Sequence, residues 1–437
     1  MLGRSLLVYP LFVFLLGIAT LHALFPSGHW QLPAIRSWRE YSMLGLSCYL
    51  LLVSWFLARR MPLQPPLRAF NVPVIASLVL LGCWLGTRIV MQDHFSSRDE
   101  QMAVFDARIF ASGRLFAALP QGWSDEAQAL NLEFILPLDR QAAWVSAYLP
   151  MNAAIRSVFA QFSIESLTSP ALAAGAILLV WSCARALWPE DRGAAAVAVL
   201  GLAGSGQFIL TAMTPSAMTA HLFLSLLWLR LFLADRGRCD AAALVVGFVA
   251  TGLHQPVFHP LFVAPFLTIL LLRRQWRRLL PFFGGYLLIC GFWLVWPGLI
   301  ADLAGGAAPA SGQVSVDYLD RLRATLHVDQ SNLALFAYNA AGFAGWQHLL
   351  ILPLAAMGVW QVRHLALGRA LAASVLLPFV VMTIILPDQG FGYGYRYVHG
   401  ALGSVALLAG YGWHGMATAE RVAARPMLAW TTAFSVL

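Results

Sequence analysis

Long apolar runs separated by short polar connections recur along the whole chain. Most runs hold about twenty residues, enough for a helix rising 1.5 Å per residue to cross a hydrocarbon core of roughly 30 Å. The pattern predicts membrane-spanning helices at 5–25, 41–58, 71–91, 167–187, 193–213, 215–234, 240–257, 258–272, 279–299, 332–362, 370–387 and 399–416. We therefore expect an all-α polytopic membrane protein with about 12 transmembrane helices.

The two ends of the chain extend this scheme. The first apolar run begins just after Arg4 and is longer than the roughly 7 to 15 residues of a signal-peptide core, so we expect it to be retained. Residues 1–60 then form an N-terminal transmembrane hairpin. Residues 417–437 are expected to be an inner connection and a partial final span, as in a fragment of a longer protein.

Composition and charge support this class and set an orientation. Hydrophobic residues make up 59% of the chain and charged residues 11%, with a mean hydropathy of +0.71. The net charge is +8, and all 28 lysine and arginine positions are arginine. Arginine gathers in every second connection, which by the positive-inside rule predicts a cytoplasmic N-terminus rather than a nucleic-acid partner. The five cysteines fall in predicted spans or an inner connection, so we expect no disulfide framework.

Two long segments, 92–166 and 300–331, interrupt the series of short connections on the non-cytoplasmic side. Loops of this length usually carry function or helices of their own. In the first loop, Met102, Phe105, Ile109 and Phe116 fall within about a 60° arc, which predicts an amphipathic helix at the membrane interface. The second loop contains a stretch rich in Gly, Ala, Pro and Ser, followed by a segment of helical pattern.

The acidic pair Asp99 and Glu100 opens the predicted interfacial helix. Ser97 followed three residues later by Glu100 matches a capping box, and Asp99 suits the positive end of the helix dipole. These carboxylates also stand where a helix N-terminus favours an anionic ligand, and Asp106 lies on a neighbouring strip. The structural and the functional interpretation are compatible.

Two other outer stretches carry candidate chemistry. TGLHQPVFHP, 251–260, places His254, Gln255 and His259 at a turn between spans; it predicts either a cavity wall or a re-entrant turn with satisfied histidines, and a weak metal-ligand spacing. PDQGFGYGYRYVHG, 387–400, holds Tyr393, Tyr395, Arg396 and His399. The arginine suits a phosphate and the tyrosines a sugar, whereas the alternative is an aromatic belt with a snorkelling arginine.

These residues resemble a known family. RDEQMAVFDARIFASGRLFAALP, 98–120, is similar to the first outer loop of the GT-C membrane glycosyltransferases, including its small-Gly-basic-Leu ending at Ala111 to Leu115. GYGYRY, 392–397, resembles the late loop of bacterial members. The resemblance covers 71–416 and implies a GT-C fold. Two features depart from it: the acidic pair follows the third span instead of the first, and the Pro-rich outer motif is reduced to AYLPMN at 147–152.

The resemblance implies a polyprenyl-phosphate sugar as donor, which suits an outer site because nucleotide sugars stay in the cytoplasm. We expect inverting transfer to an acceptor hydroxyl, with Asp99 first and Glu100 second as the carboxylate that takes the proton. Arg396, helped by His254 and His399, would bind the donor phosphate. Substrate contacts are expected from Asp106, Tyr393, Tyr395, Gln255 and His259. The metal requirement is left open, with a divalent ion as one option.

Competing functions stay open at this point. A periplasmic ligase of the O-antigen type would use outer arginine and histidine with a lipid-linked donor. A lipid-linked-glycan transporter needs access from both sides and usually keeps ionisable groups near the midplane, where these spans are almost clean. A non-catalytic binding subunit is the third option. The expected location is the bacterial inner membrane, with the site facing the periplasm or exterior; the acceptor is a glycan, a lipid or a protein.

Overall fold

The computed structural model describes residues 34–65, 67, 70–120, 122–123, 134–138, 143–306, 320 and 330–437. The predicted first span, 5–25, and most of the second long loop, 300–331, lie outside the described residues. Of the predicted N-terminal hairpin, 1–60, the structure describes one long helix, α2.

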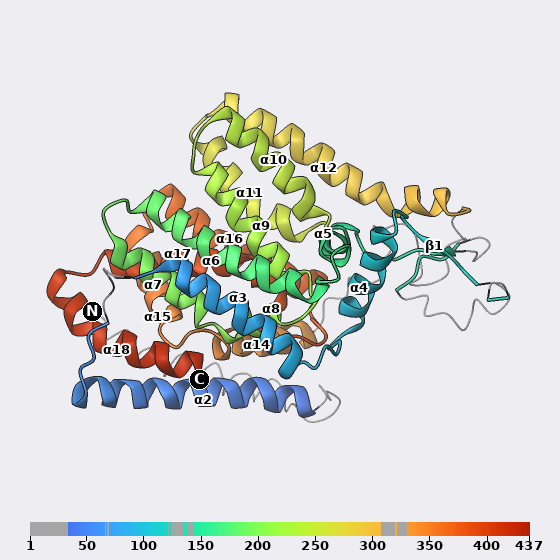
Figure 1. Cartoon of the computed structure of the whole chain (residues 1–437). Coiled ribbons are helices and arrows are strands. Elements are labelled where there is room, and N and C mark those ends of the chain that lie inside the picture. The colour runs from blue at the N-terminus through green and yellow to red at the C-terminus, as the bar shows by residue number, and fades with distance from the viewer. Residues whose placement is uncertain are drawn as a thin grey trace.

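The described chain is almost entirely helical (Figure 1). One two-stranded antiparallel sheet pairs Ala117 with Trp144 and Ala118 with Ala143. In chain order the elements are α2 (Ala34–Arg60), α3 (Val72–Ile89), α4 (Arg98–Ala111), β1 (Ala117–Ala118), β2 (Ala143–Trp144), α5 (Met151–Ala160), η3 (Glu165–Leu167), α6 (Thr168–Leu187), α7 (Arg192–Ala203), α8 (Gly206–Ala212), α9 (Met218–Phe232), α10 (Gly237–Thr251), α11 (Phe258–Leu272), α12 (Trp276–Leu303), α14 (Gln330–Gly345), α15 (Ile351–Val362), α16 (Ala366–Ile385), η4 (Arg396–Ala401), α17 (Leu402–His414) and α18 (Thr418–Val436).

Fewer helices are long enough to cross a membrane than the hydropathy pattern predicts. Within the described ranges, five helices pass by length and composition, and a sixth is counted if α7 and α8 form one span bent by 59°. The predicted span 193–213 is therefore a broken one, and 332–362 is divided into α14 and α15. The helices α9, α11 and α15 are apolar but short. The expectation of about 12 spans is corrected because an apolar run of 10 to 15 residues equally fits a helix buried inside protein.

The break between α7 and α8 has a local cause. Ser205 begins α8, and its hydroxyl accepts a hydrogen bond from the Phe208 amide at 3.2 Å. A hydroxyl that caps the next helix competes with continuation of the previous one. The same residue donates to the Gln347 side chain at 2.9 Å, which ties the break to the turn between α14 and α15.

The helices of the core approach each other closely where glycine faces glycine. α17 packs between α15 and α7. A Cβ at Gly358 of α15 would lie 1.9 Å from the Leu408 carbonyl oxygen, and one at Gly412 of α17 would lie 2.0 Å from the Leu354 oxygen. Neither side can hold a larger residue, so the two backbones are in direct contact, as small residues allow between membrane helices.

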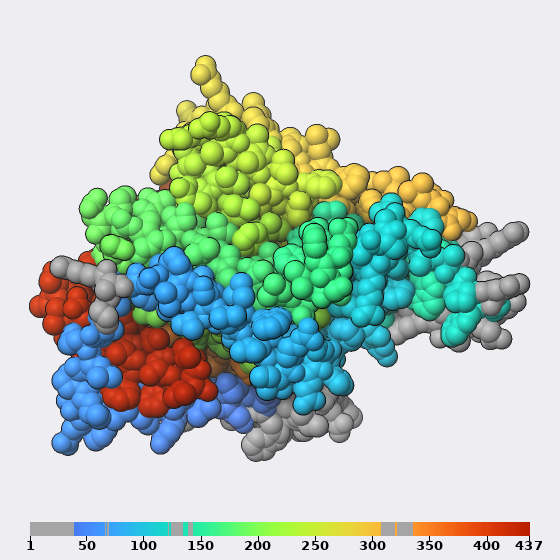
Figure 2. All heavy atoms as spheres, viewed as in Figure 1, coloured from blue at the N-terminus to red at the C-terminus, as the bar shows by residue number. Residues whose placement is uncertain are grey.

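Two peripheral units frame this core. The helices α10, α11 and α12 project on one side, and α2 and α18 lie together on another (Figures 1 and 2). At one end of the molecule, α4 packs against α5 beside the small sheet (Figure 1). This end carries the acidic pair.

The glycine contact between α15 and α17 gives a direct test of the packing. We expect Gly358→Ala to lower the unfolding free energy by about 1 to 3 kcal/mol, because the added methyl group forces two helix backbones apart. Gly291→Ala in α12 is the matched control, since nothing lies within 4 Å of a Cβ there. Thermal melting of both variants in the same detergent measures the difference; equal melting temperatures would contradict the described contact.

Candidate functional site

The start of α4 positions the two carboxylates. The helix begins after Ser97 as predicted, but the Ser97 side chain makes no capping hydrogen bond. Instead, Glu100 Oε2 accepts the backbone N–H of Ser96 at 2.7 Å. The expected capping box is therefore replaced by a bond one residue earlier. Glu100 is turned into the protein by this bond, which separates it from its neighbour Asp99.

The face of α4 that packs on protein is distinct from the apolar arc predicted to lie at the membrane interface. Glu100, Ala103, Val104, Asp106 and Ala107 are the buried residues of the helix. The four residues of the predicted apolar arc are only partly buried, and the last of them lies beyond the end of α4. The small residues on the buried face allow the close approach to α5, and the position of the apolar arc at a membrane interface stays a prediction.

Asp99 is the centre of a cluster built from four separate segments. Arg396 Nη1 donates to Asp99 Oδ2 at 2.8 Å, and the Tyr148 hydroxyl donates to Oδ1 at 2.5 Å. His254 Nε2 lies 3.3 Å from Oδ2. The Tyr148 ring also meets the His254 ring edge to face, with centroids 5.1 Å apart. The structure thus brings together three of the residues that the sequence singled out, and adds Tyr148.

The electrostatics of this cluster favour a charged pair. Burial raises the pKa of Asp99, but the hydrogen bond and charge of His254, the charge of Arg396 and the bond from Tyr148 outweigh it and hold the pKa far below its usual range. Burial lowers the pKa of Arg396, yet the charges of Tyr397 and Asp99 raise it overall. Asp99 is therefore an ionised carboxylate whose negative charge is held by protein donors.

The loop before Arg396 is fixed by buried amide side chains. Gln389 Oε1 accepts the backbone N–H of Arg396 at 2.7 Å, and Gln389 Nε2 donates to the Gly394 oxygen at 2.7 Å. Gln207 Nε2 donates to the Tyr395 oxygen at 2.9 Å and Gln207 Oε1 accepts from Gln347 at the same distance. Arg396 points inward to Asp99, so the alternative of a snorkelling arginine in an aromatic belt is wrong.

A second support comes from the N-terminal helix. Arg39 Nη2 donates to the Gly392 carbonyl oxygen at 2.5 Å, and its guanidinium lies 5.0 Å from the Phe391 ring centroid. Glu40, which is fully buried, accepts from Arg39 and from the Trp346 indole, the latter at 2.6 Å. Through Arg39, α2 holds the outside of the loop that Gln207 and Gln389 hold from within.

Sequence reasoning missed Tyr148, Arg39 and Gln389 as parts of this site. Two of them left a signal. Tyr148 falls in AYLPMN, the reduced outer motif, and Arg39 and Glu40 form a charged pair at the start of a long apolar run. Tyr148 lies 49 positions from its partner Asp99, and Arg39 lies 353 positions from its partner Gly392. No local periodicity of the sequence predicts such partners.

Glu100 and Asp106 lie away from the Asp99 cluster. Burial raises the pKa of Glu100, against the bond from Ser96 and the charge of Arg156. Arg156 is itself buried and donates to the Ser169 hydroxyl at 2.6 Å. Burial raises the pKa of Asp106 to about 7, against a hydrogen bond with Ser146. Both carboxyls face protein on the packed side of α4.

The remaining predicted residues take varied positions. His259 Nε2 lies 3.0 Å from the Tyr286 hydroxyl inside the helical core. The Tyr393 hydroxyl contacts Met91 Sδ at 3.6 Å. Tyr395 is fully buried against Phe379. Gln255 is partly buried in the turn before α11.

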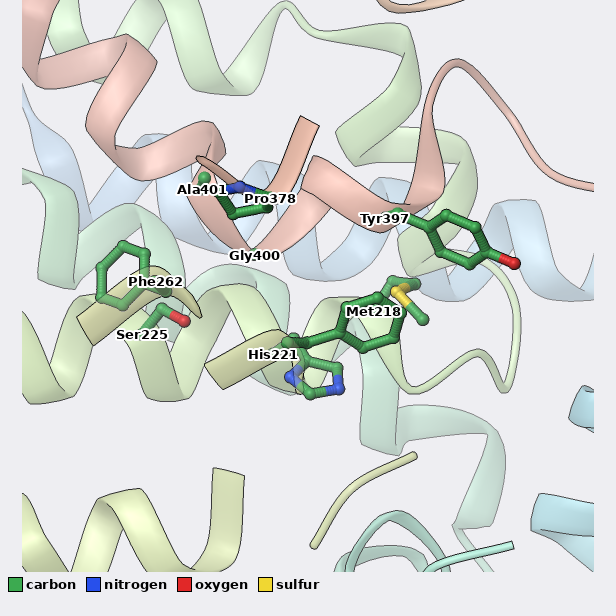
Figure 3. A pocket seen from close by; sticks show the side chains of 9 residues that line it. Met218, His221, Ser225, Phe262, Pro378, Tyr397, Gly400 and Ala401 are labelled. Atoms are coloured by element: carbon green, nitrogen blue, oxygen red, sulfur yellow. The ribbon is translucent and has the colours of Figure 1, made fainter. Parts of the chain in front are cut away.

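His399 is buried without a polar partner on either ring nitrogen, and burial lowers its pKa to about 3. Nearby, His221, Ser225 and Tyr397 line a cavity of about 20 Å³ (Figure 3). Such a volume holds a single water and not a sugar ring. His399 is therefore a neutral core residue in this structure.

The described part of the chain contains no cluster of side chains suited to bind a metal ion. No group of three His, Cys, Asp or Glu side chains there could hold an ion. His254 and Asp99 are adjacent, but the carboxylate also takes Tyr148 and Arg396 as donors. An arginine in contact with the same oxygen opposes a bound cation by charge repulsion.

Comparison with known proteins shows the fold. No protein-family model and no curated protein matches the sequence. The structure of ArnT from Cupriavidus metallidurans bound to undecaprenyl phosphate matches with a TM-score of 0.54 and 15% identity, over 79% of this chain and 60% of that one. Its apo form matches with a TM-score of 0.50 and 14% identity over the same shares. The Archaeoglobus fulgidus oligosaccharyltransferase, in complex with Zn and sulfate, matches with a TM-score of 0.51 and 14% identity, over 84% of this chain and 53% of that one.

The architecture of this chain is therefore similar to that of GT-C membrane glycosyltransferases at low sequence identity. The described part is an all-α, multi-pass membrane fold of that kind. The chain spans 60% or less of the length of the chains it matches.

The position of Asp106 predicts a pH-dependent stability difference. The pKa of Asp106 is about 7 in the folded protein and 3.8 in an unfolded chain, so the folded protein binds the proton more tightly. The free energy of unfolding therefore falls as pH rises from about 4 to about 7. Asp106→Asn stays neutral throughout. We expect the melting temperature of the variant to exceed that of the wild type at pH 8 and to approach it at pH 4. A variant that melts below the wild type at pH 8 would contradict this.

The contact of Arg39 with Gly392 predicts control of the loop from α2. Arg39→Ala removes a charge-assisted hydrogen bond, so we expect amides 389–396 to exchange with deuterium about tenfold faster. Arg59→Ala, at the exposed far end of α2, is the matched control. Unchanged exchange of 389–396 in Arg39→Ala would show that the buried glutamines hold the loop alone.

Proposed function

We propose that this protein is a membrane glycosyltransferase that moves a sugar from a polyprenyl-phosphate donor to an acceptor hydroxyl. The observation that carries the proposal is the contact between Asp99 and Arg396, with His254 and Tyr148 on the same carboxylate. A candidate base and a candidate phosphate-binding cation are in direct hydrogen-bond contact. The fold likeness to ArnT, whose structure holds undecaprenyl phosphate, supports the donor class.

Arg396 would bind the donor phosphate. It is a mostly buried guanidinium with a Nε that has no partner, and its backbone is fixed by Gln389. A guanidinium forms paired hydrogen bonds with phosphate oxygens. Because the same group now neutralises Asp99, the arriving phosphate competes with the carboxylate for it.

This competition would activate the base. In the free protein, Asp99 is too strongly stabilised as an anion to be a good proton acceptor, since basicity falls with pKa. When the phosphate takes the charge of Arg396, Asp99 loses part of that stabilisation and its pKa rises. The carboxylate thus becomes an effective base only once donor is bound, which limits unproductive proton transfer before that.

The chemical step follows from this arrangement. The acceptor oxygen attacks the anomeric carbon while its proton passes to Asp99, and the bond between that carbon and the phosphate oxygen breaks. The polyprenyl phosphate leaves with the electron pair, and Arg396 stabilises its growing negative charge. Attack opposite the leaving group inverts the anomeric configuration. Tyr148 and His254 hold the carboxylate in place.

Of the other predicted residues, Glu100 and Asp106 fit supporting roles. Glu100 is bonded to Ser96 and faces Arg156, so we assign it to the position of α4 and not to the proton transfer. Asp106 would act through the packing of the same helix. Tyr393 and Gln255, which are only partly buried, stay candidates for sugar contacts.

We propose that this chemistry takes place in the bacterial inner membrane. The arginine distribution favours a cytoplasmic N-terminus and a site on the periplasmic or exterior side. A lipid-linked donor is then required, because nucleotide sugars are not available there. The acceptor would be a glycan, a lipid or a protein with a free hydroxyl at the membrane surface.

One observation favours a second candidate. The very low pKa of Asp99 suits a permanent counter-ion as well as a switchable base. In a transferase of the O-antigen-ligase type, Arg396 would bind the phosphate, His254 would take the proton, and Asp99 would only orient them. The two candidates differ in what happens when the Asp99 charge is removed.

The test uses the full chain in nanodiscs with a short-chain polyprenyl-phosphate sugar and envelope extract as acceptor. We expect Asp99→Asn to bind donor at least as well as the wild type, because Arg396 loses its competitor, while transfer falls by about 10² to 10⁴. Arg396→Ala is expected to lose at least tenfold in donor affinity, on the scale of one charge-assisted hydrogen bond.

Matched controls are Asp93→Asn and Arg98→Ala, an exposed acid and an exposed arginine beside the site. Both should leave binding and transfer unchanged. Transfer that persists in Asp99→Asn and disappears in His254→Gln would favour the ligase-type reaction. Donor affinity that is the same in Arg396→Ala as in the wild type would overturn the proposal.

A further inference from the structure

A charged cavity lies at the opposite end of α6 from the Asp99 cluster. Ser169, near the start of α6, accepts from Arg156 beside α4, whereas Leu187 and Trp188 at its other end line a cavity of about 770 Å³. The cavity is bounded by the turn between α6 and α7 and by the connection from α17 to α18. A 20-residue helix is about 30 Å long, so the two ends of α6 are separated by roughly the thickness of a hydrocarbon core.

Asp191 organises one wall of this cavity. Its Oδ1 accepts the Ala194 amide at 2.9 Å and so caps α7, and its Oδ2 lies 2.7 Å from Arg421 Nη1 and 2.8 Å from His414 Nδ1. Arg421 also donates to the carbonyl oxygens of Met416 and His414. The Asp191 charge is therefore already neutralised within the wall.

Two other arginines are left to face the cavity. Arg192 is exposed, and Arg425 is half-buried with a buried Nε that has no hydrogen-bond partner. Neither forms an ion pair with any residue that the structure describes. Glu190 is the further acid of the lining, on the exposed turn. With Arg421 balanced by Asp191, the lining has a positive excess.

Uncharged donors lie in the same wall. The Trp188 side chain is 5% exposed, and its indole N–H has no partner. Gly193 is the second residue of α7, where a backbone amide has no acceptor within the helix. A Cβ there would lie 3.3 Å from Asp191 Oδ1 and 3.5 Å from Nε1 of a second indole, Trp413. Because Asp191 already caps this N-terminus, the buried side-chain donors of the wall that lack a partner among the described residues are the Trp188 indole and Arg425 Nε.

Apolar side chains border these polar groups. Leu67 and Leu187 line the cavity, and Val422 does so with 46% of its surface exposed. A free anion makes no apolar contacts with these side chains, whereas a lipid presents a phosphate and an apolar chain together. Basic pockets between membrane helices at the surface are typical sites for anionic head groups.

We propose that this cavity binds the phosphate head group of a membrane lipid on the face opposite Asp99. Arg192 and Arg425 would hold the phosphate, and Leu187 and Val422 would contact the chain. The ligand chemistry is a lipid-borne phosphate, from either a glycerophospholipid or a polyprenyl phosphate. The inference rests on these residues alone and does not depend on glycosyl transfer.

Native mass spectrometry of the purified full chain tests it. The probes are dioleoylphosphatidylglycerol, dioleoylphosphatidylcholine, a short-chain polyprenyl phosphate and inorganic phosphate. We expect Arg192→Ala/Arg425→Ala to bind the anionic lipid at least tenfold more weakly, on the scale of charge-assisted bonds. Arg192→Lys/Arg425→Lys should keep most of the binding, which separates loss of charge from loss of fold.

The matched control is Arg238→Ala/Arg274→Ala, two exposed arginines of predicted inner connections that do not line the cavity. Preference for phosphatidylglycerol or for the polyprenyl phosphate supports the proposal and identifies the lipid source. Equal losses in the two double alanine variants would overturn it as general charge attraction. Inorganic phosphate that binds as tightly as the lipids would overturn the lipid assignment, and so would equal binding of phosphatidylcholine.

Discussion

A carboxylate and a guanidinium that are both mostly removed from water stabilise each other only while they stay in contact, because either one alone would be an uncompensated charge. Asp99 and Arg396 are in this position, and 297 residues separate them in sequence. The end of the molecule that carries α4 is arranged around that contact. α4 presents the carboxylate, the loop before η4 presents the guanidinium, and Tyr148 and His254 complete the hydrogen bonds of the carboxylate.

The contact depends on an unusual loop support. The side-chain amide of Gln347 bonds to that of Gln207, and those of Gln207 and Gln389 bond to the loop backbone, so a segment without regular structure gains partners for backbone groups at residues 394, 395 and 396. The break between α7 and α8 serves the same support, since it brings Gln207 beneath the loop and Ser205 against Gln347. A straight helix through 193–213 would place these two side chains differently. The broken helix therefore supports the contact between Asp99 and Arg396.

Much of this could be predicted from the sequence, and the rest had physical reasons to stay hidden. Hydropathy indicated the helical membrane class, and the predicted orientation put Asp99, His254 and Arg396 on one side, where the structure brings them into contact. The number of spans was overestimated because hydropathy does not distinguish a lipid-facing helix from one enclosed by protein. Gly204 to Gly206 did signal a break inside an apolar run. Tyr148 and Arg39 were missed because their partners are set by the fold and not by spacing.

The position of α2 bears on the order of events during synthesis. This helix contacts α14, α18 and the Gly392 carbonyl, so it is completed by parts of the chain that are made several hundred residues later. Closing a loop of more than 300 residues between Arg39 and Gly392 has an entropic cost that only the finished packing offsets. A chain interrupted before residue 392 lacks both Arg396 and the carbonyl that Arg39 holds. A nascent chain would accordingly hold Asp99 without its guanidinium partner until residue 396 has been made.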